Sequence, residues 1–311
     1  MQAKRTICAV LAWLALSSAG LAQDIDDDAV AAMRDMADSG YSSEFGRSPG
    51  WHLADHRKLA ASLAALQSQR PGIVDAYVVV VGLDSDGVFG REATEASRVL
   101  SLRYDAAGRT ILLAAGDGTD APNGSPQNLA TALGAVASVM DTEEDVLILF
   151  TTSHGSAESG LAYRDGAFGN GMIGPNRLKT MLDDSGIARR MVILSACYSG
   201  IFVPALQSDT SVIITAASAT TTSFGCAAEN DWTFFGDALL NNAMRANDPL
   251  PVAARKAFGL IAAWEKKVRI GASKPQLSIG KKAKVWLAPL EARIPNETTA
   301  KVGRPALQTS R

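Results

Sequence analysis

The stretch "MVILSACYSG", residues 191–200, predicts a buried strand that ends abruptly in a turn of small residues. Four apolar residues are followed at once by Ser195, Ala196, Cys197, Tyr198 and Gly200. Free cysteine is among the most buried residue types, so packing alone could explain Cys197. A strand end with small neighbours is also where an α/β fold can present a nucleophile. Cys197 alone does not decide between these two interpretations.

The segments around this strand alternate between buried strands and amphipathic helices. Apolar, β-branched runs predict strands at 75–82, 109–116, 145–151, 191–196 and 211–217, with a last strand at 284–290. Helical spacing is found at 51–72, 90–104, 127–140, 174–186, 232–244 and 251–268. This alternation is typical of a mostly parallel sheet covered on both faces, so we expect one α/β domain over residues 51–290.

The two ends of the chain lack the strand and helix pattern of this domain. Lys4 and Arg5 precede the apolar run "ICAVLAWLAL" and the small residues of "SSAGLAQ", the order of a secretory signal peptide. We expect cleavage near Ala22 and a secreted or periplasmic protein with no stable membrane anchor. Residues 23–50 then read as a flexible acidic leader with at most one short helix, and residues 291–311 as a loose tail.

The composition and net charge indicate which classes of binding partner to expect. The chain has 311 residues, is 47% hydrophobic and has a formal net charge of −2. A nucleic-acid-binding protein would need a basic face, so we expect no nucleic-acid partner. Composition does not predict the oligomeric state.

Polar residues follow two successive predicted strands. His154 and Gly155 end the strand at 145–151, and Cys197 ends the next strand along the chain. If these strands are neighbours, the histidine can hold the cysteine as a thiolate. Without a side chain, Gly155 lets its backbone N–H approach a developing oxyanion. We therefore favour a catalytic Cys197–His154 pair with Gly155 in the oxyanion hole over a loop histidine without a role.

These motifs resemble those of the legumain-type cysteine peptidases of the caspase-like clan, in their bacterial branch. "LILFTTSHGS" and "MVILSACYSG" match the family's two strand ends, and "ITAASATTTSFGCAAENDWTFFGDAL" is similar to its segment after the nucleophile. The resemblance implies a caspase-like three-layer α/β sandwich that cleaves protein or peptide substrates without a metal or organic cofactor. It implies Cys197 as nucleophile, His154 as catalytic histidine and Gly155 as oxyanion-hole residue.

The substrate pocket departs from the family pattern. Asp237, Thr222 and Ser223 match pocket positions, and Arg91 falls near a basic pocket position, but Ser195 stands where legumains have an acid. The resemblance implies cleavage after asparagine or another polar residue.

Three alternatives remain open from the residues. Export would leave Cys197 and Cys226, which an oxidising compartment could join in a permanent or reversible disulfide, although the resemblance implies that Cys226 does not pair with the nucleophile. "HLADH" places His52 and His56 on one helical face, as in a zinc hydrolase, but no third ligand is apparent. The scaffold could also serve as a catalytically silent binding module.

Overall fold

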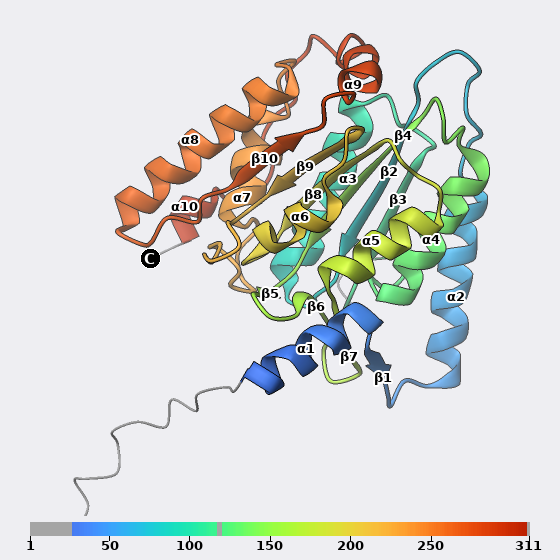
Figure 1. The fold of residues 1–311 in the computed structure, drawn as a ribbon, viewed down its shortest axis with the longest axis vertical. Coiled ribbons are helices and arrows are strands. Elements are labelled where there is room, and N and C mark those ends of the chain that lie inside the picture. The colour runs from blue at the N-terminus through green and yellow to red at the C-terminus, as the bar shows by residue number, and fades with distance from the viewer. Residues whose placement is uncertain (1–26, 117–119, 310–311) are drawn as a thin grey trace, which may run out of the picture.

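The centre of the fold is a six-stranded sheet. The computed structural model describes residues 27–116 and 120–309 (Figure 1). The strand order is β10-β9-β8-β4-β2-β3, and every neighbouring pair is parallel except β9 with β10. The strands are β2 (Ala76–Gly82), β3 (Thr110–Ala114), β4 (Val146–Thr152), β8 (Arg190–Ser195), β9 (Ser211–Thr215) and β10 (Gln276–Ile279). The prediction of a mostly parallel sheet is confirmed.

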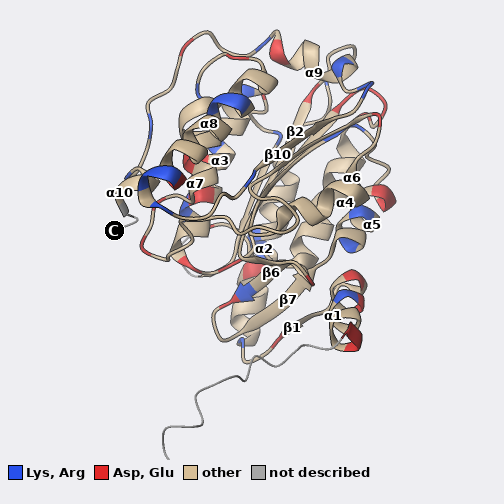
Figure 2. Cartoon of the chain, turned by 60° about the vertical axis from the view of Figure 1, so that its left-hand side comes forward, with Lys and Arg blue, Asp and Glu red and all other residues tan. Residues whose placement is uncertain are grey.

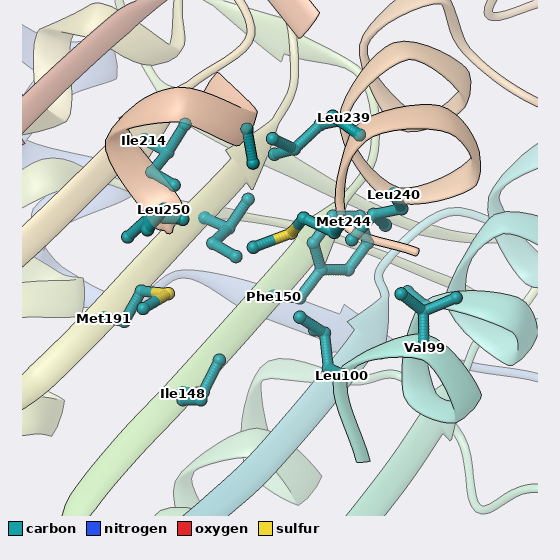
Figure 3. Close-up of a cluster of buried hydrophobic side chains, with 14 of the residues drawn as sticks. Val99, Leu100, Ile148, Phe150, Met191, Ile214, Leu239, Leu240, Met244 and Leu250 are labelled. Carbon is teal, nitrogen blue, oxygen red and sulfur yellow. The ribbon is translucent and has the colours of Figure 1, made fainter. Parts of the chain in front are cut away.

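The central strands are buried on both faces. Every residue of β2, β4 and β8 is buried, because helices cover each face and exclude water from both sets of alternating side chains. Val78, Val80, Ile148 and Phe150 point into one core layer, part of which Figure 3 shows. Their sequence neighbours point into the other layer.

Two helix layers enclose the sheet, as in the predicted three-layer arrangement. One face is covered by α3 (Gly87–Arg103), α7 (Phe234–Gly236), the π-helical η2 (Asp237–Ala243), α8 (Leu250–Val268) and α9 (Lys284–Glu291). The other face is covered by α2 (Pro49–Ala64), α4 (Pro126–Val139), α5 (Pro175–Asp184), the 3₁₀ turn η1 (Ser199–Phe202) and α6 (Val203–Leu206). Figure 2 shows the sheet between these layers, with the charged positions concentrated on helices and loops. No helix among the described residues is long and apolar enough to cross a membrane.

A second, four-stranded sheet includes part of the segment that was predicted to be a flexible leader. Its order is β1-β7-β6-β5, made of β1 (Ser42–Glu44), β5 (Gly155–Ser156), β6 (Gly160–Asp165) and β7 (Gly169–Ile173). Helix α1 (Asp27–Ser39) precedes it, and the Gly174 N–H donates to the Ala37 carbonyl at 3.1 Å. Residues 27–50 are therefore structured from α1 onward. The predicted signal peptide, residues 1–22, lies outside the described residues.

The C-terminal part differs from its prediction in two ways. Residues 284–290 form α9 and not a strand, because Trp286, Leu287 and Leu290 lie on one buried helical face. Residues beyond 291 pack against the domain: the Trp232 indole N–H donates to the Val302 carbonyl at 2.8 Å, and α10 (Ala306–Thr309) begins with a fully buried Ala306. The tail predicted as loose is thus docked.

Candidate active site

The ends of β4 and β8 bring His154 and Cys197 to one edge of the sheet. These strands are parallel neighbours, and Thr152 pairs with Ser195 at their last positions. The Ser153 N–H donates to the Ser195 carbonyl at 3.2 Å, so the pairing continues past the last strand residues. His154 and Cys197 each lie two residues beyond this pair. Function in open α/β sheets is placed at such carboxyl ends.

A sharp turn after β8 positions Cys197. Tyr198 has a φ of 55°, an uncommon conformation for a residue with a side chain. The Tyr198 N–H donates to the Thr221 carbonyl at 3.0 Å, which holds the turn. A Cβ atom on Gly200 would lie 2.4 Å from the Ala219 nitrogen, so only glycine fits there. The small residues of "SACYSG" therefore allow the chain to leave the strand steeply.

The surroundings of the Cys197 sulfur favour the thiolate. The Cys226 thiol beside it lowers the pKa of Cys197 to about 6, with help from the Ser223 backbone and the charge of His154 and against the effect of burial. The Ser223 N–H lies 3.2 Å from the Cys197 sulfur. The same contact and burial raise the pKa of Cys226. Cys197 and Cys226 are both free thiols in this structure.

The His154 ring contacts Asp86 and Phe89. Its Nε2 lies 3.4 Å from Oδ2 of Asp86, and its ring contacts Phe89 edge to face with 5.0 Å between centroids. Asp86 is held in turn by the Arg164 guanidinium at 2.5 Å. Asp86 lies just after a predicted strand in "GLDSDG", but the sequence alone did not predict a role for it in the site. A carboxylate beside the histidine can orient the imidazole.

Gly155 lies directly against the nucleophile segment. A Cβ atom at this position would lie 2.4 Å from the Cys197 carbonyl oxygen. Any side chain would push the two segments apart, so the close approach of residue 155 to the Cys197 carbonyl requires glycine here.

The residues predicted for the substrate pocket lie in different environments. Thr222 is exposed, and Ser223 contacts the Cys197 sulfur. Arg91 lines a cavity of about 440 Å³ that also includes Asp86, and its Nε donates to the Asn230 carbonyl at 3.1 Å.

Ser195 and Asp237, like Ser223, are buried. The Ser195 hydroxyl donates at 2.8 Å to Glu92, a carboxyl group that was not predicted to belong to the site. Asp237 is 1% exposed, and its carboxylate accepts from Asn241 at 2.9 Å and from the Ala306 N–H at 2.8 Å. A substrate could reach the Asp237 carboxylate only by displacing these contacts.

The histidines of the zinc alternative lie elsewhere. His52 and His56 are exposed on α2. Asp55 between them accepts from the Asn123 N–H at 2.6 Å and from the Asn128 amide at 3.0 Å, so it ties α2 to the start of α4. Among the residues that the structure describes, no group of three or more His, Cys, Asp or Glu side chains could hold a metal ion.

Comparison with known proteins finds a family profile that covers His154 and Cys197. The profile of the peptidase C13 family matches residues 124–265, a segment that includes both strand ends and Cys226. No curated protein sequence gives a significant match. Among 88 matching chains of solved structures is the crystal structure of caspase-1 from Spodoptera frugiperda, with 11% identity, a TM-score of 0.45, and coverage of 66% of this chain and 86% of that chain. The profile match makes residues 124–265 similar to the peptidase C13 family, the legumain family of cysteine peptidases.

Proposed function

We propose that the protein is a cysteine endopeptidase in which Cys197 is the nucleophile and His154 the general acid and base. The observation that carries this proposal is the pairing of β4 with β8, which brings both residues to one sheet edge. A pKa of about 6 at Cys197 supports it, because most of the thiol is then ionised at neutral pH.

The reaction follows from these groups. The Cys197 thiolate attacks the peptide carbonyl carbon, and the Gly155 N–H stabilises the oxyanion that forms. Protonated His154 donates its proton to the leaving amine as the C–N bond breaks, which leaves an acyl group on the sulfur. His154 then takes a proton from water, the hydroxide attacks the thioester, and the carboxylic acid product leaves as the thiolate is restored. Asp86 orients the imidazole through both steps.

Substrate preference is the finer part of the proposal. The Ser223 N–H contacts the sulfur of the nucleophile, and the exposed Thr222 precedes Ser223 in the chain. The hydroxyl groups of these two residues can bond an amide side chain. The adjacent cavity is lined by the acidic Asp86, Glu95 and Asp231 and by the basic Arg91 and Arg98. Because these charges largely balance, the cavity suits an uncharged side chain better than a charged one. We therefore propose cleavage after asparagine or another uncharged polar residue.

A peptide library tests activity and preference together. Purified protein from residue 23 onward should cleave peptides after asparagine or another polar residue, while Cys197→Ala should leave the library intact. Cleavage mainly after aspartate would contradict the pocket proposal, and equal cleavage by Cys197→Ala would contradict the nucleophile.

We also propose that the protein is exported, on the basis of the charged and apolar order of residues 4–22. Expression of the full chain in a bacterial host with fractionation should give a periplasmic or secreted product whose mass corresponds to a start near Gln23. An uncleaved product in the cytoplasm would contradict export.

A further inference from the structure

Glu92 is a buried carboxyl group beneath the candidate active site. It lies on α3 with no exposed surface, and no lysine or arginine within the described ranges forms an ion pair with it. Its Oε1 accepts from the Thr152 hydroxyl at 2.9 Å and from the Ser195 hydroxyl at 2.8 Å. Its Oε2 accepts from the Thr233 N–H at 2.9 Å. A buried carboxyl group without a cation persists only when such donors satisfy it.

The three donors come from the segments that form the site. Thr152 ends β4, two residues before His154, and Ser195 ends β8, two residues before Cys197. Thr233 caps the start of α7 through its side chain, which accepts from the Gly236 N–H. One carboxyl group therefore joins both catalytic strand ends to the start of the helix that follows the 221–232 loop.

The space around Glu92 leaves its carboxyl group little freedom. A Cβ atom on Gly236 would lie 2.0 Å from Oε2 of Glu92, so the backbone of α7 packs directly on it. The Ser195 and Thr233 hydroxyl oxygens lie 3.3 Å apart, which closes the network. Burial raises the pKa of Glu92 while its hydrogen-bond donors oppose that effect.

We propose that Glu92 is a positioning residue of the active site: its carboxyl group fixes the ends of β4 and β8 relative to each other and to α7. The inference deepens the proposed peptidase function and rests on it for its kinetic consequence. Glu92 is fully buried and acts through Ser195 and Thr152, without contact with the substrate. The role comes from its shape and its hydrogen-bond acceptors, and not from its charge.

Two substitutions separate these contributions. Glu92→Met keeps the length of the side chain and removes every acceptor, so three donors lose their partner. Glu92→Gln removes the charge, but its amide oxygen can accept from the Thr233 N–H while its NH₂ group donates to the two hydroxyl oxygens. Asp145→Leu is the matched control: Asp145 is also buried and accepts from the Asp75 and Asp141 N–H groups, at the opposite end of β4.

The experiment measures the rate of Cys197 alkylation by iodoacetamide between pH 5 and 9, by peptide mass spectrometry, on protein that circular dichroism shows to be folded. Glu92→Met should raise the midpoint pH of the alkylation profile by about one unit. The reason is that the Cys197 thiolate depends on contacts that the fixed strand ends provide. Its kcat for a cleaved peptide should fall about tenfold or more with KM changed less than about twofold. Glu92→Gln and Asp145→Leu should keep the parent profile and kcat.

Two results would overturn the inference. A parent-like profile in Glu92→Met means that the carboxyl group positions nothing, and equal shifts in Glu92→Met and Glu92→Gln mean that its charge is what acts. If Glu92→Met does not fold, Thr152→Val combined with Ser195→Ala removes the two hydroxyl donors and should give the same upward shift. A parent that is alkylated normally but cleaves no peptide contradicts the proposed function, while the alkylation comparison still decides the role of Glu92.

Discussion

Replacement of Cys226 should make Cys197 less reactive at acidic pH. The neighbouring Cys226 thiol is the largest cause of the lowered pKa of Cys197, which is about 6. A hydrogen bond to a charged group contributes about 1.5–3 kcal/mol, and one pKa unit corresponds to about 1.4 kcal/mol. Cys226→Ala should therefore raise the pKa of Cys197 by roughly one to two units.

The direction of the pH effect follows from this shift. At pH 6 about half of the parent thiol is ionised, against roughly 1–10% in Cys226→Ala, so iodoacetamide should react with Cys197 about 5- to 50-fold more slowly. Above about pH 9 the thiol is ionised in both proteins, and the two rates should converge. The assay follows Cys197 alkylation by peptide mass spectrometry on fully reduced protein.

Cys226→Ser is the matched control for this prediction. Its hydroxyl can still donate to the thiolate, so its profile should lie closer to the parent than that of Cys226→Ala. Equal rates at pH 6 for the parent and Cys226→Ala would refute the reasoning, and so would a faster reaction in Cys226→Ala.

Two further substitutions test the site and the core. Asp86→Asn removes the negative charge that faces His154 Nε2 at 3.4 Å. It should lower kcat about tenfold or more with KM little changed. An unchanged kcat in steady-state assays would argue against an orienting role. Phe150→Ala removes a fully buried ring from the cluster in Figure 3 and should cost about 3–5 kcal/mol of unfolding free energy. Urea denaturation would show this loss, and a change below about 1 kcal/mol would contradict the packing described here.

The sequence predicts the main sheet well because its central strands are long apolar runs. "YVVVV" and "VLILF" have no polar position that would allow a solvent-facing helix, so their assignment follows from composition alone. The order of the motifs then placed His154 and Cys197 at successive strand ends. Their adjacency in the sheet required the structure, because sequence order does not fix strand order.

The predictions that differ from the structure also have specific physical causes. The run "KVWLAPL" fits both a buried strand and one face of a short helix, and the packing of Trp286 and Leu290 selected the helix. Strand β6 contains a glycine and an aspartate, and β7 contains two glycines and an asparagine, all residue types with low strand propensity. The tail docks through isolated contacts such as Val302 with Trp232, which no periodicity reveals.

Glu92 and Asp86 illustrate what sequence reasoning misses in a site. A glutamate on an amphipathic helix is normally exposed, and the donors to Glu92 are 60, 103 and 141 residues away along the chain. Asp86 lies in a turn whose local pattern also suits a simple strand-to-helix connection. The roles of both residues in the site can be inferred only once the structure shows which strand ends lie together.

The most direct measurement of the central claim is a comparison of kcat/KM for peptide hydrolysis by the parent, Cys197→Ala, His154→Ala and the double variant. If the two side chains act as one unit, each single variant should lose about 10³-fold or more, and the double variant should be little worse than either. Hydrolysis by Cys197→Ala at the parent rate would contradict the assignment of the nucleophile. Losses that multiply in the double variant would contradict the joint action of Cys197 and His154.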